Sequence, residues 1–172
     1  MKYFLIGLPG SGKTTLGRKL ATTLKIPFVD LDHEIEKRET ISTQVIFKKF
    51  GEKYFREVES TVLKAWCERM GSFVMATGGG APCFFDNMDT INQAGKSIFI
   101  DVSASEIAKR IMKSDKSERP LFANVDKDSM KDRIEFMRSQ RLSFYKQAHL
   151  TVQGDEINVD LIIELLERNP EG

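Results

Sequence analysis

The sequence predicts an α/β fold of three layers, in which a parallel sheet of about five strands is flanked by helices. Short apolar runs alternate along the chain with longer amphipathic stretches, an order that is typical of βαβ units. The apolar runs are nearly continuous, as expected of strands that are buried on both faces. The chain has 172 residues, 41% of them hydrophobic and 30% charged, which fits a single globular domain.

Five short apolar runs are bounded by polar or turn residues, and we expect each to form a buried strand. In chain order, these expected strands cover residues 3–6, 27–30, 73–76, 97–101 and 150–152. Residues with helical periodicity lie between them. The expected helices cover residues 13–24, 41–50, 52–70 and 159–166. The stretch 113–126 begins with polar residues between two further helical patterns, and we expect it to form a mobile lid.

Composition and charge exclude several classes of protein. The formal net charge is +1, so we expect no nucleic-acid partner. No apolar run approaches the roughly 18 residues of a membrane span, and the first residues lack a signal-peptide pattern. We therefore expect no membrane partner and a cytoplasmic location. The cysteines and histidines have no metal-ligand spacing, which argues against a zinc site. No long apolar patch or heptad seam is evident, which favours a monomer.

Residues 7–14 (GLPGSGKT) match the phosphate-binding pattern G-x-x-x-x-G-K-[ST], between an expected strand and an expected helix. Glycines let backbone N–H groups turn inward around phosphate oxygens, and the helix N-terminus adds the positive end of its dipole. We expect Lys13 to contact the β and γ phosphates and Thr14 to coordinate Mg²⁺. The expected ATP-binding residues of this loop are Gly10, Ser11, Gly12, Lys13, Thr14 and Thr15.

Among P-loop proteins, a kinase is favoured, because the sequence has no N-K-x-D guanine motif and is too short for a motor ATPase.

Two carboxylates, Asp30 and Asp32, lie at the end of the second expected strand. The third expected strand ends at Thr77 without a metal-supporting carboxylate, so Asp30 is the nearest candidate for that role. In an extended segment Asp32 would point the same way as Asp30 and face a hydroxyl substrate. The alternative is an exposed acidic turn that caps the next helix.

Arg56 and Glu59 are three residues apart, which places them on one helical face. One interpretation is a guanidinium that forks onto a substrate carboxylate while Glu59 orients it. The alternative is a surface ion pair of little energetic value. The run Gly78–Gly80 at a strand end favours close approach of a small substrate to backbone N–H groups over a flexible loop.

Two further arginines are candidates. Arg119 lies in the polar stretch, where it is either a lid residue over the transferring phosphoryl group or a solvated loop charge. Arg141 shares a helical face with Tyr145, four residues on, and on this spacing alone it is a surface residue.

These segments, in this order, resemble the shikimate kinases, which are small P-loop kinases of the nucleoside monophosphate kinase fold. The resemblance runs from residue 7 to about residue 145. It rests on the P-loop, D-x-D at 30–32, F-R-x-x-E at 55–59, G-G-G at 78–80, R-P-L at 119–121, and Arg141 four residues before Tyr145. Many families share a P-loop, whereas the D-x-D, F-R-x-x-E and G-G-G combination is far more restricted.

The resemblance implies transfer of the γ-phosphoryl group of ATP to the 3-hydroxyl of shikimate, with Mg²⁺, in aromatic amino acid (chorismate) biosynthesis. It implies that Lys13, Asp32 and Arg119 are catalytic and that Asp30 supports the metal through water. It adds Arg110 and Arg119 to the ATP-binding residues. The implied shikimate-binding residues are Asp32, Arg56, Glu59, Gly79, Gly80 and Arg141.

Two other functions stay open at this point. Another small-molecule kinase, such as a gluconate kinase, would share the P-loop and the lid but accept a substrate without a ring. A catalytically silent nucleotide-binding regulator would keep the P-loop alone, and the charged set described above argues against it.

Overall fold

The computed structural model describes residues 1–113 and 127–169 of the chain. Each expected strand is present, with bounds within one residue of those expected. The strands are β1 (Lys2–Ile6), β2 (Phe28–Asp30), β3 (Phe73–Ala76), β4 (Lys96–Asp101) and β5 (Leu150–Gln153). They form one sheet in the order β2-β3-β1-β4-β5, and every neighbouring pair runs parallel. The predicted fold class is therefore confirmed.

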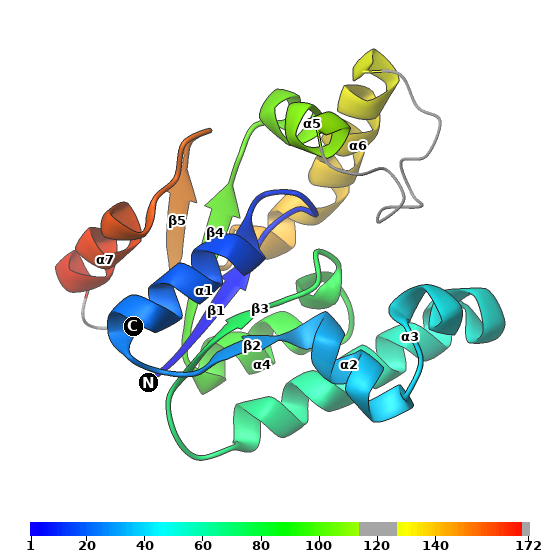
Figure 1. The fold of residues 1–172 in the computed structure, drawn as a ribbon, viewed down its shortest axis with the longest axis horizontal. Helices are drawn as coiled ribbons and strands as arrows, with labels where there is room; N and C mark the ends of the chain where they lie inside the picture. The colour runs from blue at the N-terminus through cyan, green and yellow to red at the C-terminus, as the bar shows by residue number, and fades with distance from the viewer. Residues whose placement is uncertain (114–126, 170–172) are drawn as a thin grey trace.

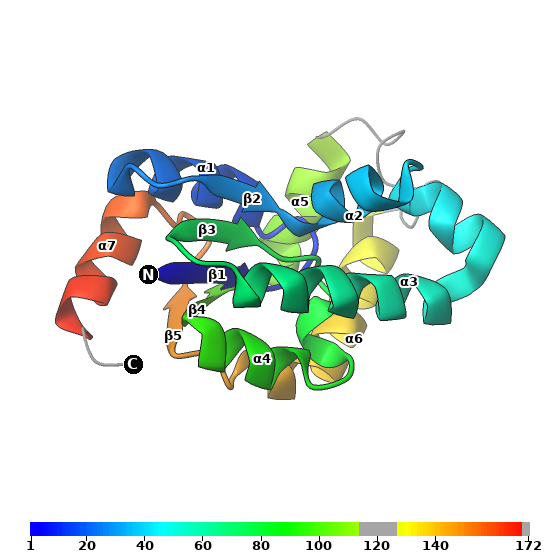
Figure 2. The same cartoon turned by 90° about the horizontal axis from the view of Figure 1, so that it is seen from below.

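Helices cover both faces of this sheet and complete the three layers (Figures 1 and 2). The described residues form α1 (Lys13–Leu24), α2 (Leu31–Glu39), α3 (Thr43–Glu68), α4 (Asn87–Ala94), α5 (Ala104–Lys113), α6 (Lys127–Tyr145), α7 (Val159–Arg168) and a short 3-10 helix, η1 (Ala81–Cys83). In Figure 2, α1 lies on one side of the sheet and α4 on the other. No helix in the described ranges combines the length and the apolar character that crossing a membrane requires.

The core is built on the central strand. Phe4, Leu5 and Ile6 of β1 are completely buried, because β3 and β4 flank this strand and helices cover both of its faces. The ring of Phe73 on β3 meets Phe4 edge to face at 5.7 Å and Trp66 of α3 at 5.4 Å, which ties α3 to the sheet. The central strands are continuously apolar because, as the sequence indicates, they are buried on both faces.

The segment after β2 differs from the sequence expectation. Asp32 does not continue an extended strand, because it is the second residue of α2, so the alternation that would align it with Asp30 is wrong. Asp30 is extended (φ −107°, ψ 119°) and caps α2 by accepting hydrogen bonds from the N–H groups of Asp32 and His33. The capping alternative is thus observed for Asp30, and its side chain still faces the P-loop, as described below.

The helical patterns at 41–50 and 52–70 form one element that is broken at Gly51. Gly51 has φ 81° and ψ 173° inside α3, a backbone region in which glycine is favoured. The expected lid, 113–126, lies outside the described residues except for Lys113, which ends α5.

Gly17 lies where α1 packs most tightly on the sheet. A Cβ at this position would lie 2.7 Å from Cε2 of Phe28 and 3.1 Å from Cδ1 of Leu5. We expect Gly17→Ala to lower the free energy of unfolding by about 1 kcal/mol, because overpacking outweighs the gain in helix propensity. Urea unfolding measures the effect, and Thr23→Ala on the exposed face of α1 is the control. A Gly17→Ala protein as stable as the wild type would contradict the tight packing.

Candidate active site

The loop between β1 and α1 forms the first wall of the site. Gly12 is left-handed (φ 96°, ψ 13°) at the start of α1. The buried ammonium of Lys13 donates to the carbonyl oxygens of Gly7 and Leu8 at 2.9 and 2.8 Å, so it lies against the loop. Ser11 is 1% exposed, and its hydroxyl has no hydrogen-bond partner among the described residues. A buried, unsatisfied hydroxyl in a loop of this shape fits a phosphate ligand.

A hydroxyl and a carboxylate meet at the end of this loop. Thr14 Oγ1 donates to Asp30 Oδ2 at 3.1 Å, while Asp30 Oδ1 caps α2. Mg²⁺ that is bound with ATP usually takes one or two protein oxygens and completes its shell with phosphate and water. Thr14 and Asp30 fit that pattern, and no group of three or more His, Cys, Asp or Glu able to hold a metal occurs in the described part of the chain. Thr15 is exposed one residue beyond Thr14.

Arg110 on α5 lies beside the P-loop. Its guanidinium donates to the carbonyl oxygen of Ser11 at 3.2 Å, to Glu106 Oε1 at 3.0 Å and to the carbonyl oxygen of Asp155. Nη1 of Arg110 lies 3.5 Å from the position that a Cβ on Gly12 would take. Arg110 therefore joins the P-loop to the segment that follows β5.

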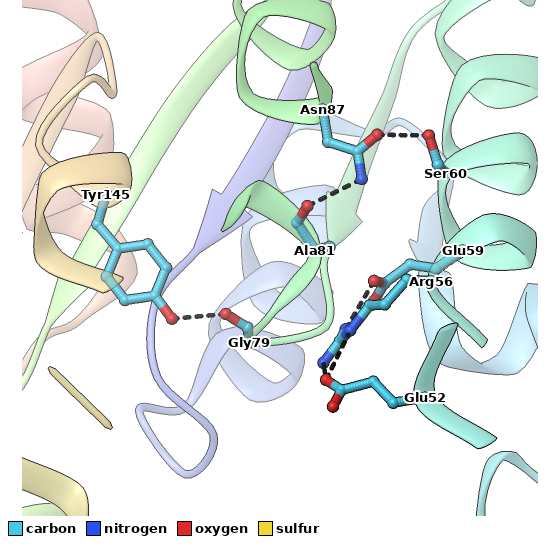
Figure 3. Close-up of polar contacts among 8 residues, drawn as sticks. All are labelled: Glu52, Arg56, Glu59, Ser60, Gly79, Ala81, Asn87 and Tyr145. Carbon is cyan, nitrogen blue, oxygen red and sulfur yellow. Dashed lines mark hydrogen bonds and ion pairs between the residues drawn. The ribbon is translucent and has the colours of Figure 1, made fainter. Parts of the chain in front are cut away.

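The Arg56–Glu59 pair is buried, so the surface-pair alternative is wrong. Arg56 Nη1 donates to Glu59 Oε2 at 2.7 Å, and the two side chains are 10% and 1% exposed (Figure 3). Glu52 accepts two longer bonds of 3.4 Å from the same guanidinium. The rings of Phe84 and Phe55 lie 4.3 and 5.1 Å from it. A guanidinium with aromatic faces around it and a carboxylate behind it is held in one orientation.

Glu59 and Asp32 form a pair of carboxylates with raised pKa values. Burial raises the pKa of Glu59 to about 7, against the lowering effect of Arg56, and the charge of Asp32 adds to the rise. Glu59 Oε1 has no hydrogen-bond partner among the described residues. Asp32 keeps exposed surface area, yet the protein crowded around its carboxyl removes hydration and, with the charge of Asp30, raises its pKa to about 6.

Gly78 separates these two carboxylates. A Cβ on Gly78 would lie 2.9 Å from Glu59 Oε1 and 3.1 Å from Asp32 Oδ1, so the two oxygens are at most about 6 Å apart. Two carboxylates at this separation repel each other, which is why the charge of Asp32 adds to the raised pKa of Glu59.

The next two glycines contact other parts of the site. A Cβ on Gly79 would lie 2.6 Å from Cδ of Pro9 in the P-loop, and one on Gly80 would lie 2.5 Å from Nη2 of Arg56. The glycine run is therefore a packed junction between the P-loop and the Arg56 cluster, and this packing disfavours the flexible-loop alternative.

Arg141 on α6 belongs to the same cluster. Burial raises the pKa values of Glu59, Cys83 and Tyr145, and the positive charge of Arg141 opposes this rise in all three. Arg141 is half-buried, so its interpretation from spacing alone as a surface residue is wrong. Arg119, the expected lid arginine, lies outside the described residues.

Sequence reasoning missed several supporting residues. Asn87 is fully buried; its amide donates to the carbonyl oxygen of Ala81 at 2.9 Å and accepts from Ser60 Oγ at 2.7 Å (Figure 3). No local pattern marks such a residue. Arg138 donates to both carboxylate oxygens of Asp101 at 2.9 Å. Its position three residues before Arg141 on one helical face is a signal that could have identified it.

Comparisons with known proteins give the family of the chain. A family model described as shikimate kinase matches residues 9–168. A shikimate kinase of Bacteroides thetaiotaomicron is 37% identical over 97% of this chain and 99% of its own length. One of Clostridium botulinum (strain Langeland) is 35% identical over 92% of this chain and 90% of its own length.

Solved structures give the same result. The crystal structure of shikimate kinase from Bacteroides thetaiotaomicron superposes with a TM-score of 0.91 at 37% identity, covering 97% of this chain and 98% of the other. Shikimate kinase from Acinetobacter baumannii in complex with shikimate gives 0.85 at 31% identity, covering 97% and 91%. With the family model matched over most of its length, the chain belongs to the shikimate kinase family of ATP-dependent phosphotransferases.

Proposed function

We propose that this chain transfers the γ-phosphoryl group of ATP to the 3-hydroxyl of shikimate. The observation that carries the proposal is the glycine run, which brings the P-loop, the Arg56–Glu59 pair and Asp32 to one place. A relative that is 31% identical has been solved with shikimate bound, which supports this acceptor. The expected monomeric state stays a prediction.

The P-loop and Arg110 bind ATP. Backbone N–H groups of Gly10 and Gly12 surround the phosphates, and the hydroxyl of Ser11, which has no partner among the described residues, donates to them, while the Ser11 N–H stays on the carbonyl oxygen of Leu8. On ATP binding, Lys13 leaves the carbonyl oxygens that it contacts for the β and γ phosphates. Thr15 adds a further contact at the start of α1.

Thr14 would hold Mg²⁺ directly and Asp30 through water, as their hydrogen-bonded contact allows. Bound there, Mg²⁺ supplies positive charge that neutralises the phosphate oxygens.

Arg56 and Arg141 clamp the carboxylate of shikimate. Arg56 uses one nitrogen for Glu59 and keeps its other donors for the substrate, because its bonds to Glu52 are long and partly exposed. Glu59 fixes the plane of the guanidinium, and two nitrogen donors in that plane match the two oxygens of a carboxylate.

Asp32 receives the 3-hydroxyl. Its pKa of about 6 leaves it ionised at neutral pH, so it accepts a hydrogen bond from the hydroxyl and then the proton. Phosphoryl transfer depends chiefly on position and charge, so aligning the oxygen with the γ-phosphorus matters as much as removing its proton. The expected contribution of Arg119 to charge stabilisation stays a prediction, because that residue lies outside the described ranges.

The first test is ADP release from purified protein with Mg²⁺ and ATP, against shikimate, quinate, gluconate, AMP and no acceptor. We expect ADP release to be stimulated by shikimate, because the two-arginine clamp and Asp32 fit a compact acid that carries hydroxyl groups. Stimulation by another acceptor alone would keep a kinase but reject shikimate. Silence with every acceptor, from protein that binds ATP, would indicate a nucleotide-binding regulator.

Arg56→Lys keeps the positive charge beside Glu59 but loses the two-pronged donor geometry. We expect the KM for shikimate to rise about 10- to 100-fold, the value of charge-assisted hydrogen bonds of about 1.5–3 kcal/mol, with the KM for ATP changed by less than about twofold. Steady-state kinetics with each substrate varied in turn measure both constants. Arg38→Lys, at an exposed ion pair on α2, is the matched control. Equal rises in both KM values would refute the clamp.

Activity should depend on pH through Asp32. Its pKa is raised to about 6, so as the pH falls through that value Asp32 gains a proton and loses its ability to accept one. We expect kcat/KM for shikimate to fall as the pH drops through about 6, approaching tenfold per pH unit below that value, and more steeply where Glu59 also protonates.

Replacing the same carboxylate gives a second measurement of this role. Asp32→Asn should lower kcat by about 10²–10⁴-fold at pH 7.5 with little change in ATP affinity, while Glu34→Gln on the same helix should not. A kcat for Asp32→Asn that stays within about twofold of the wild type removes Asp32 from the reaction.

A further inference from the structure

Tyr145 has no role in the site as described so far. It is completely buried at the end of α6, and its hydroxyl donates a hydrogen bond of 2.5 Å to the carbonyl oxygen of Gly79 (Figure 3). Its ring packs on Phe99 of β4, with the ring centroids 5.0 Å apart. Burial holds the pKa of the phenol above its ordinary value, so the hydroxyl stays a donor at neutral pH.

The Gly79 carbonyl and the Gly80 N–H belong to one trans peptide and therefore point in opposite directions. Because the carbonyl points to Tyr145, the Gly80 N–H points away from it. Figure 3 shows Tyr145 and Arg56 on opposite sides of the loop, and Arg56 Nη2 lies 2.5 Å from the Cβ position of Gly80. Within the described residues, no acceptor is found for the Gly80 N–H. This N–H is thus free on the side where Arg56 lies.

Other contacts hold the residues on either side of this peptide but not the peptide plane itself. Pro9 packs against Gly79 from the P-loop side. Beyond Gly80, the next carbonyl along, that of Ala81, is held by Asn87, which is held in turn by Ser60. The Ala81 N–H donates to the Gly78 carbonyl oxygen at 3.1 Å, which closes a turn around this peptide but leaves its plane to be set by a further contact. Among the described side chains, the Tyr145 hydroxyl makes that contact.

We propose that Tyr145 is a positioning residue that aims the Gly80 N–H at the substrate carboxylate held by Arg56. The inference rests on the proposed function, because it needs a carboxylate at Arg56. Tyr145 acts through the peptide and does not touch the substrate. Without the hydroxyl the Gly79 carbonyl loses its partner, the peptide rotates, and the N–H no longer faces the carboxylate squarely, which weakens a hydrogen bond to a charged group.

The test is Tyr145→Phe, which keeps the ring on Phe99 and removes the hydroxyl together with its hydrogen bond to Arg141. The amide signal of Gly80, described below, is therefore the readout that is specific to the peptide. We expect the Kd and the KM for shikimate to rise about 5- to 10-fold, as the loss of one such hydrogen bond implies. The KM for ATP should change by less than about twofold, because the ATP contacts are made by other residues. Calorimetric titration with shikimate and steady-state kinetics supply these constants.

Two control variants separate positioning from a general loss of stability. Tyr54→Phe removes a hydroxyl that bonds to Glu39 at 2.8 Å on an exposed part of α3, away from the glycine run. Ile162→Val weakens the core under α7, far from the site in sequence, and matches a modest loss of stability. Neither control should change the Kd for shikimate.

The amide signal of Gly80 gives a readout that stability does not move. In ¹H–¹⁵N spectra of the wild type, saturating shikimate should shift the Gly80 amide proton downfield, and in Tyr145→Phe this shift should be clearly smaller. An unchanged shift together with a Kd within twofold of the wild type overturns the inference. Equal rises in the shikimate and ATP constants also overturn it.

The same experiment separates this inference from the function on which it rests. Wild-type protein that does not phosphorylate shikimate overturns the proposed function and the inference with it. Wild-type turnover of shikimate with an unaffected Tyr145→Phe protein overturns the inference alone.

Discussion

The parallel pairing of β1 with β3 on one side and β4 on the other decides where every candidate functional residue lies. Parallel strands deliver their carboxyl ends to one edge of a sheet, and in open α/β folds that edge is where ligands bind. The P-loop follows β1, the glycine run follows β3, and Asp30 closes β2 at the same edge. Segments separated by scores of residues therefore meet without any long excursion of the backbone. The helices add the remaining groups, Arg56 from α3 and Arg141 from α6, around an edge that the sheet has already fixed.

The acidic pair beside the glycine run works against folding. Glu59 is fully buried, and one of its oxygens has no hydrogen-bond partner in the described part of the chain. Its neighbour Asp32 carries a raised pKa, so each ionised carboxylate is less favourable here than in water. Arg56 offsets part of this cost through a short ion pair, but a buried pair of this kind seldom stabilises a fold on balance. Perturbed titratable groups gathered at a sheet edge are characteristic of sites that natural proteins keep for chemistry.

Sequence reasoning located the strands to within one residue, because strands buried on both faces have continuous apolar sequences. It located the P-loop, Arg56 and Glu59 because local spacing carries their geometry. It failed where the deciding contact is distant in sequence: the helix after Asp30 is short and polar, with weak periodicity, and Asn87 is defined by partners on α3 and η1. Arg110 was expected from the resemblance, but its contact with the carbonyl oxygen of Ser11, 99 residues away, is defined only by the fold. Arg141 needed the tertiary fold to distinguish a half-buried site residue from a surface one.

The three glycines after β3 are alike in the sequence but are not interchangeable in the fold. Gly78 faces the carboxylates, Gly79 faces Pro9 and Gly80 faces Arg56, so a side chain at each would displace a different partner. In evolutionary terms, this wall of the pocket cannot drift by single substitutions, since each step would damage a separate part of the machinery. A descendant that acquires a larger acceptor would instead change α2 and the start of α3 before Gly51, where side chains such as Phe47 and Phe50 are exposed. Substitutions that change the acceptor should therefore be found in those helices and not in the glycine run.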